Sequence, residues 1–345
     1  MGFSIGPIVG MYAKPRYRVI SAVLGETFSP QHGFDIYIDL NTIVNVLSSA
    51  SKFLNSLPFS EDCEKDIVSC VLGIVKHWKD YTRNKYDDVR IILMVNEFEM
   101  RPLPEQDVLK SYLVPYMNKF KQDRFKQMVY YWGEAMKKIE VVLKYVPNCY
   151  LVKTNFVDSY VIPMILSNEN RMRLIVSGNA MFTSYNYIPN TKVIYTRFSR
   201  NGHSQISDPL MICQKISKID DDIMDTFCQN KVFYNLLQAI IGDFDRGIMG
   251  ITQIGISNFA NELLRAIEQN RVPKNPKSIE VVFPAINKNY HGYLKQAYPL
   301  IDVETHLQLI PPSIIEKTKG LLIDLIDIDG LSRLSVDGMN LMELL

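Results

Sequence analysis

Acidic and amide side chains follow several apolar runs of this sequence. The run FDIYIDL over residues 34–40 predicts a buried strand that carries Asp39 at its end, and two later apolar runs are followed by Asn96 and Asn179. Ligand sites of open α/β sheets lie beyond the carboxyl ends of the strands. We therefore expect these three residues to converge at one edge of a sheet, together with Asp243.

Two interpretations of Asp39 stay open. Its carboxylate suits a ligand site at a strand end, and it equally suits the N-cap of a following helix over residues 43–53. Asp35, at the start of the same strand, is expected on the surface.

A glycine-rich connection separates two apolar helical patterns within residues 234–268. The first pattern stops at Gly242, and Gly250 and Gly255 lie in the connection. Glycine lets a backbone pass close to a phosphate, and free amides at a helix start bind anions. Ser257 is the expected N-cap of the second helix. The stretch therefore predicts a nucleic-acid clamp, or else an ordinary helical hairpin with glycine at its bend.

Residues 102–144 combine basic and aromatic side chains on a largely helical pattern. Such a mixture suits a surface that binds a single nucleic-acid strand. The alternative is an amphipathic helix pair whose rings fill the core and whose lysines are solvated. The basic residues near the centre of this stretch are Lys119, Lys121, Arg124 and Lys126.

The composition excludes several classes of protein. The chain has 345 residues, 47% of them hydrophobic, and a net charge of +1, so any basic surface must be local. Its five cysteines lack paired spacing, which fits free thiols and argues against a zinc site. No apolar run is long enough to cross a bilayer. We expect a cytoplasmic protein without a membrane partner, in the host cytoplasm if the frequent Tyr, Asn, Ile and Lys reflect a viral genome.

Apolar runs alternate with helical patterns in the first part of the chain. This alternation predicts an α/β fold with a mainly parallel sheet flanked by helices, and its strands are expected at 34–40, 89–95, 150–153, 173–177 and 193–198. Helices are expected at 62–83, 157–166, 314–327 and 339–345. The chain divides into an N-terminal arm over 1–33, an α/β domain over 34–230, and a helical domain with a C-terminal extension over 231–345.

The stretch from Gly242 resembles the helix–three-turn–helix of the flap endonuclease and 5′–3′ exonuclease family. The similarity rests on Gly242-Asp243, Gly250, Ile254-Gly255-Ile256 and Ala260. It implies a PIN-like nuclease fold in which the hairpin holds duplex DNA and residues 102–144 form a helical arch. Asn258 stands where the family often has a lysine. Beyond the hairpin, the resemblance rests on the order of elements over about residues 34 to 268.

The resemblance also implies a set of metal-binding acids, and most are replaced here. Asp39 and Asp243 remain, whereas Asp158 falls on a position where the family has alanine. The other acidic positions carry Asn96, Val157, Ser159, Tyr160, Asn179, Met181 and Arg246. Because paired magnesium ions need several carboxylates, we expect at most weak binding of one ion, at Asp39.

Three functions follow as hypotheses. The first is a non-catalytic protein that binds DNA or RNA through Gly250, Gly255, Ser257, Asn258 and the basic arch. The second is an active Mg²⁺-dependent nuclease with a site rebuilt from Asp39, Glu97, Glu99 and Asp158. The third is a structural subunit of a larger assembly, such as a viral one, that presents surfaces to protein partners. The first hypothesis needs no cofactor.

Overall fold

A computed structural model describes most of the α/β part of the chain and most of the helices that follow it. The described residues are 33–40, 61–83, 85–96, 122–154, 157–167, 170–199, 202–206, 227–242, 248, 250–251, 256–322, 335–336 and 339–340. The predictions for the arm, for the helix over 43–53, and for Glu97, Glu99, Lys119, Lys121, Asp243, Arg246 and Gly255 lie outside them.

The predicted sheet is confirmed, and its described strands run in the order β3-β2-β1-β4-β5-β6. Strands β1 to β5 are parallel, and β6 pairs antiparallel with β5. Their bounds are β1 Phe34–Asp39, β2 Val89–Asn96, β3 Cys149–Thr154, β4 Met172–Ser177, β5 Thr191–Ser199 and β6 Gly202–Ile206. Each predicted strand is found within one or two residues of its expected ends.

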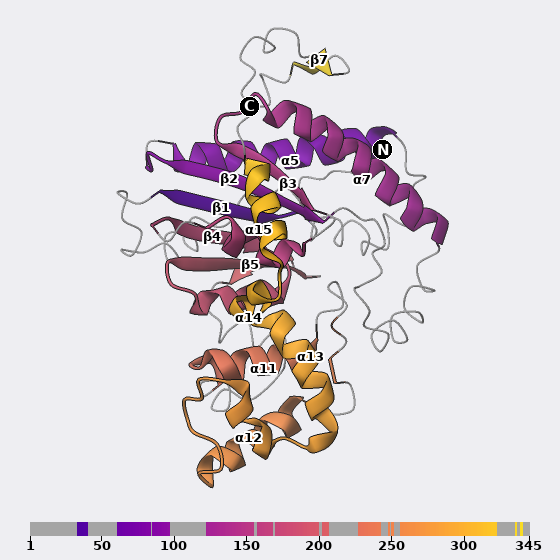
Figure 1. Cartoon of the computed structure of the whole chain (residues 1–345). Helices are drawn as coiled ribbons and strands as arrows, with labels where there is room; N and C mark the ends of the chain where they lie inside the picture. Colours follow the sequence, from indigo (N-terminus) through magenta and orange to yellow (C-terminus); the bar gives the residue numbers. More distant parts are fainter. Residues whose placement is uncertain are drawn as a thin grey trace.

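Two long helices cover one face of the sheet, α5 (Glu61–Thr82) and α7 (Gln122–Leu143), and they pack against each other (Figure 1). Alternate side chains of each strand point to the same face, so Ile36 and Ile38 of β1 meet this helix pair. Trp78 of α5 and Trp132 of α7 are buried in the same cluster. The rings of the predicted basic stretch therefore contribute in part to the core.

The opposite face is covered by short helical elements. These are η1 (Ser159–Val161), α8 (Ile162–Ile165), η2 (Ala180–Tyr187) and α11 (Lys231–Ile241). The single helix predicted over 157–166 is wrong in extent. Asp158 caps η1 by accepting a hydrogen bond from Tyr160 N (2.9 Å). Pro163 has no N–H to donate to the carbonyl one turn earlier, so η1 and α8 do not join into one continuous α-helix.

The remaining helices follow α11. In Figure 1, α11 lies with α12 (Ile256–Glu268) and α13 (His291–Ile301) at the lower end of the molecule, while α15 (Pro312–Lys319) returns beside the sheet. The connecting elements are η4 (Ile279–Val281), η5 (Phe283–Ala285), η6 (Lys288–Tyr290), α14 (Val303–Gln308) and η7 (Gly320–Leu322). Among the described residues, no helix is both long and apolar enough to cross a membrane.

The helix predicted over 339–345 is wrong at its start. Met339–Asn340 form strand β8, which pairs antiparallel with β7 (Ser335–Val336). The two residues between these strands are Asp337 and Gly338. Asp-Gly is a strong signal for a two-residue hairpin loop, and it outweighs the helical spacing of the apolar residues.

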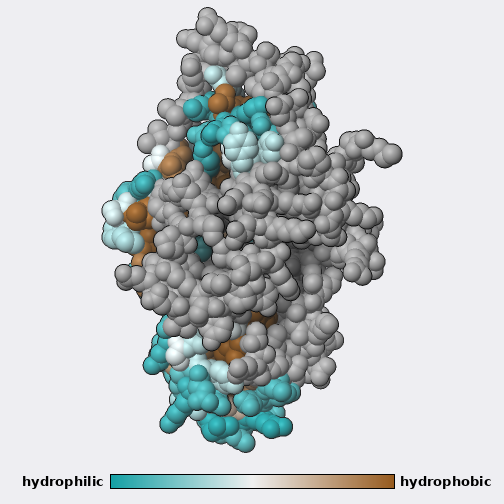
Figure 2. Space-filling view, turned by 90° about the vertical axis from the view of Figure 1, so that its right-hand side faces the viewer, coloured by the Kyte–Doolittle hydropathy of each residue, from teal (hydrophilic) through white to brown (hydrophobic). Residues whose placement is uncertain are grey.

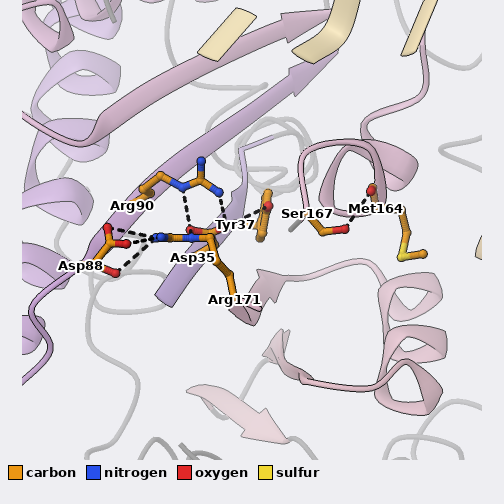
Figure 3. Close-up of polar contacts among 7 residues, drawn as sticks. All are labelled: Asp35, Tyr37, Asp88, Arg90, Met164, Ser167 and Arg171. Atoms are coloured by element: carbon orange, nitrogen blue, oxygen red, sulfur yellow. Dashed lines mark hydrogen bonds and ion pairs between the residues drawn. The ribbon is translucent and has the colours of Figure 1, made fainter. Parts of the chain in front are cut away.

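The expectation that Asp35 lies on the surface is also wrong, because its side chain is fully buried. Asp35 Oδ1 accepts hydrogen bonds from Arg90 Nε (2.8 Å) and Arg171 Nε (2.7 Å), and its Oδ2 accepts one from Arg90 Nη2 (2.5 Å) (Figure 3). Arg171 also forms an ion pair with Asp88. One carboxylate thus joins the amino ends of β1 and β2 to the residue before β4.

The neighbouring phenol belongs to the same network. Burial, and then the charge of Asp35, raises the pKa of Tyr37 far above its usual value. The phenol therefore stays protonated and donates to Asp35 Oδ2 (3.4 Å). The hydrogen bond to Asp35 likewise raises the pKa of Arg90. The carboxylate of Asp35 is consequently surrounded by donors.

We predict that Asp35→Asn lowers the free energy of unfolding by about 3–5 kcal/mol, because it leaves the partly buried Arg90 without its counterion and Arg171 with only the exposed Asp88. The measurement is urea-induced unfolding followed by circular dichroism. Asp88→Asn is the matched control, since the Asp88 side chain is 62% exposed, and an exposed ion pair contributes about 0–1 kcal/mol. Equal losses in the two variants would contradict the importance of Asp35.

Candidate functional site

The topology places a candidate site where the strand order reverses. From β1, the chain adds β2 and β3 on one side and β4 and β5 on the other, so the switch point lies between β1 and β4. In open parallel sheets the crevice beyond the carboxyl ends at this point binds ligands. Asp39 ends β1 and Ser177 ends β4. These two residues stand at the expected place.

Three polar residues form a hydrogen-bonded chain at this edge. Asp39 is 2% exposed, and its Oδ2 accepts a hydrogen bond from Ser177 Oγ (2.6 Å). Ser177 Oγ in turn accepts one from Asn179 N (2.9 Å). Asn179 Oδ1 accepts from Met181 N (2.9 Å) and so caps η2. The predicted Asp39 and Asn179 are therefore connected through Ser177, and both carry structural hydrogen bonds.

The backbone brings Asn96 to the same edge. Asp39 lies opposite Met94 in the β1–β2 register, and Asn96, two residues further on, ends β2 opposite Thr154 of β3. The strand ends that carry Asp39, Asn96 and Ser177 are thus aligned.

The side chains that the structure describes at this edge supply few ligands for a pair of metal ions. Four of the seven positions that the family resemblance assigns to further acids are buried: Val157, Ser159, Tyr160 and Met181 are at most 5% exposed. Tyr160 donates its hydroxyl to Ile301 O (2.6 Å), and the Asp158 carboxylate caps η1. Within the described ranges, no group of three or more His, Cys, Asp or Glu side chains could hold a metal ion.

A two-metal site holds its ions about 3.5–4 Å apart between shared carboxylates. Asp39 and the hydroxyl of Ser177 supply one charged donor and one neutral donor at the switch point. Among the described residues, these two donors are fewer than a pair of divalent ions requires.

The two helices of the predicted hairpin are present. α11 ends at Ile241, with Gly242 at φ 83°, and α12 begins at Ile256. Ser257 consequently lies inside the first turn of α12, so its prediction as the N-cap is wrong. Asn258 is exposed on the same turn. Among the arch residues, Arg124 and Lys126 lie in the first two turns of α7.

Gly250 has a structural reason to be glycine. Its φ is +72°, and a Cβ here would lie 2.4 Å from Ile241 O and 2.7 Å from Ile240 O. Its N–H donates to Tyr293 Oη (2.8 Å), and that hydroxyl donates to Ala239 O (2.8 Å). The amide expected to approach a phosphate is thus engaged by α13, and the close approach is made by the end of α11.

Tyr293 was not predicted, although it links the hairpin to α13. Burial raises the pKa of its phenol to about 12, partly offset by the hydrogen bond from Gly250 N. The phenol is therefore neutral and can donate and accept at once. Spacing alone gives no signal for this residue, because it lies 43 positions from Gly250 in the sequence.

Buried polar side chains also connect the sheet edge to α11. Thr183 of η2 shares a hydrogen bond with the Tyr234 hydroxyl, and Gln238 Nε2 donates to both, at 3.2 Å to Tyr234 and 3.4 Å to Thr183. Asn179 caps η2 and Thr183 lies within it, so η2 connects the switch point to α11, the first helix of the hairpin. A sequence signal existed here, since Gln238 interrupts an apolar helix.

A cavity of about 400 Å³ opens at the amino ends of the strands, opposite the edge that carries Asp39, beside the starts of β2 and β3. Its lining includes Lys79, Tyr86 and Cys149. Burial raises the pKa of the Cys149 thiol to about 12, so the sulfur stays protonated and unreactive. This cavity lies away from Asp39 and is separate from the switch point.

Comparison with known proteins finds similarity at the level of structure. No protein-family model matches the chain, and no curated protein sequence matches it significantly. Among solved structures it is similar to a zinc-bound T5 5′-exonuclease, with 15% identity, a TM-score of 0.49, and coverage of 84% of this chain and 99% of that one. It is also similar to a bacteriophage T5 flap endonuclease variant in a pseudo-enzyme–product complex with DNA and metal ions (15% identity, TM-score 0.48, 84% and 98% coverage).

We predict that Gly250→Ala destabilises the protein by more than about 1–2 kcal/mol, because alanine disfavours the left-handed backbone and its Cβ meets two carbonyl oxygens. Gly133→Ala is the matched control. Gly133 lies inside α7, and a Cβ added there would point into open space, so alanine should stabilise by about 0.5–1 kcal/mol. Thermal unfolding of both variants measures the difference. A neutral Gly250→Ala would contradict the tight turn.

Proposed function

We propose that this chain is a non-catalytic nucleic-acid-binding protein built on a fold like that of flap endonucleases. The observation that carries the proposal is the donor set at the switch point. Asp39 is buried beside Ser177, and the neighbouring cap residues Asn179 and Asp158 use their side-chain oxygens within the protein. The ligand position of a parallel sheet is retained, while the charges that metal-assisted cleavage requires are missing from the described residues around it.

Cleavage of nucleic acid would depend on the negative charge available at this edge. Hydrolysis of a phosphodiester needs an activated water and neutralisation of the charge that builds on the leaving oxygen. Magnesium performs both tasks when several carboxylates hold it, because it is a hard ion that favours charged oxygen ligands. One buried carboxylate with a serine partner cannot replace such a cluster. We therefore assign no cofactor to this edge.

The nucleic-acid partner is supported by the hairpin. The order of helix, glycine turn and helix over residues 234–268 is the part of the sequence that most resembles the duplex-binding element of the family, and α11 and α12 supply its two helices. Binding at such an element acts on the phosphate backbone rather than on the bases. DNA and RNA are both compatible with this mode.

The proposal predicts binding without cleavage. The protein is incubated with flap, nicked and single-stranded DNA and with RNA, in Mg²⁺ or Mn²⁺, and each reaction is run on native and denaturing gels. We expect retarded complexes at low salt that weaken as salt rises, because phosphate binding releases counterions. We expect no shortened product.

Asp39→Ala, purified in the same way, is the control for contaminating nucleases. Metal-dependent cleavage that is present in the wild type and lost in this variant would refute the non-catalytic proposal. It would favour the site rebuilt from Asp39, Glu97, Glu99 and Asp158. Absence of any complex at low salt would refute nucleic-acid binding.

A further inference from the structure

Cations without an ion-pair partner among the described residues recur after the hairpin turn, in the segment that we call the α12–α13 lobe (residues 256–301). Its six basic residues are Arg265, Arg271, Lys274, Lys277, Lys288 and Lys295, against the three acids Glu262, Glu268 and Glu280. The lobe thus carries a net charge of +3, while the whole chain carries +1. The rest of the chain therefore has a net charge of −2, although its residues 102–144 also carry a net charge of +3. The lobe is thus a second basic segment, and it lies at the lower end of the molecule in Figure 1.

All six basic side chains are exposed, and none forms an ion pair with another described residue. Elsewhere in the described ranges, lysines commonly have carboxylate partners: Lys138 pairs with Glu64 (2.7 Å), and Lys319 pairs with Glu316 (2.8 Å). The cations of the lobe are consequently available to an outside anion. Figure 2 shows hydrophilic side chains gathered over this end of the molecule.

The loop that displays two of these lysines is fixed by its apolar neighbours. Val272 and Pro276 are buried, whereas Lys274 and Lys277 between and after them are exposed. Pro276 O accepts a hydrogen bond from Asn230 Nδ2 (3.2 Å), which ties the loop to the N-terminus of α11. A backbone held in this way presents its lysines at a constant place beside the hairpin, so less ordering is required on binding.

Two further lysines come from the helix that positions the hairpin turn. Lys288 opens η6, which runs directly into α13, and Lys295 lies seven residues later. Lys295 Nζ is 5.9 Å from the centre of the Phe283 ring, and that ring packs on His291 with centroids 4.9 Å apart. α13 also carries Tyr293, which holds Gly250. α13 thus carries both Lys295 and the tyrosine that holds the hairpin turn, and Lys288 lies directly before this helix.

We propose that the α12–α13 lobe is a phosphate-contacting surface, and that its partner is the backbone of a nucleic-acid duplex. The inference rests on the proposed function and assigns its electrostatic contacts to residues outside the hairpin turn. A polyanion with regularly spaced charges gains from several fixed lysines at once, because each contact releases counterions from the phosphates. The amide of Gly250 takes no part, since Tyr293 accepts its hydrogen.

The test compares paired substitutions that remove two charges each. Lys274→Gln/Lys277→Gln and Lys288→Gln/Lys295→Gln alter the lobe, and Lys317→Gln/Lys319→Gln alters exposed α15 as the matched control. Fluorescence anisotropy with a labelled duplex of about 24 base pairs measures Kd at NaCl concentrations from about 50 to about 300 mM. The logarithm of the association constant falls as the logarithm of the salt concentration rises, and each lobe variant should make this slope shallower by about 2. Each should also weaken binding by about 10- to 100-fold at about 0.1 M salt. The control should match the wild type.

Three results would overturn the inference. Wild-type affinity and slope in both lobe variants would place the phosphate contacts elsewhere and leave the proposed function standing. An equal loss in the α15 control would show a general effect of charge. A wild type that does not bind the duplex at the lowest salt would remove both the inference and the proposed function. Unchanged melting temperatures of all variants confirm that the differences arise in binding.

Discussion

The buried carboxylate of Asp35 holds the amino ends of the central strands together. It lies opposite Arg90 of β2 and Arg173 of β4 in the sheet register, and it is paired with Arg90 and Arg171. A strand that slipped by one residue would move its polar side chains to the other face. Such a slip would leave Asp35 among the apolar side chains under α5 and α7. The ion pairs therefore fix the register of β1 against both neighbours.

The same register determines what happens at the other end of the sheet. The side chains of Asp35, Tyr37 and Asp39 point to the same face of β1, because they are two residues apart. The ion pairs of Asp35 at the amino end of the strand therefore also determine the position of Asp39. Ser177 reaches Asp39 because β1 and β4 are paired in register from Phe34 to Ile38. From there, η2 carries hydrogen bonds to Tyr234 of α11. The switch point and the hairpin are consequently parts of one packed structure.

Much of this fold could be predicted from sequence, because parallel strands buried on both faces are continuous apolar runs bounded by helices. That pattern predicts where β1, β2 and β4 end. It therefore also predicts that Asp39 lies close to Asn179, the residue before η2. Asp35 was misplaced because its burial depends on Arg90 and Arg171, which lie 55 and 136 residues away in the sequence. The pairing register that unites them cannot be seen in one sequence. The functions of Tyr293 and of Gly250 were missed for the same reason.

The proposed function requires that the switch point, where Asp39 is the acid among the described residues, does not bind a pair of metal ions. Titration of Mn²⁺ into the protein by isothermal calorimetry, in the wild type and in Asp39→Asn, measures this directly. The account predicts at most one weakly bound ion per chain in the wild type, lost in the variant, and no second binding event. Two tightly bound ions in the wild type, with tight binding abolished by Asp39→Asn, would contradict it.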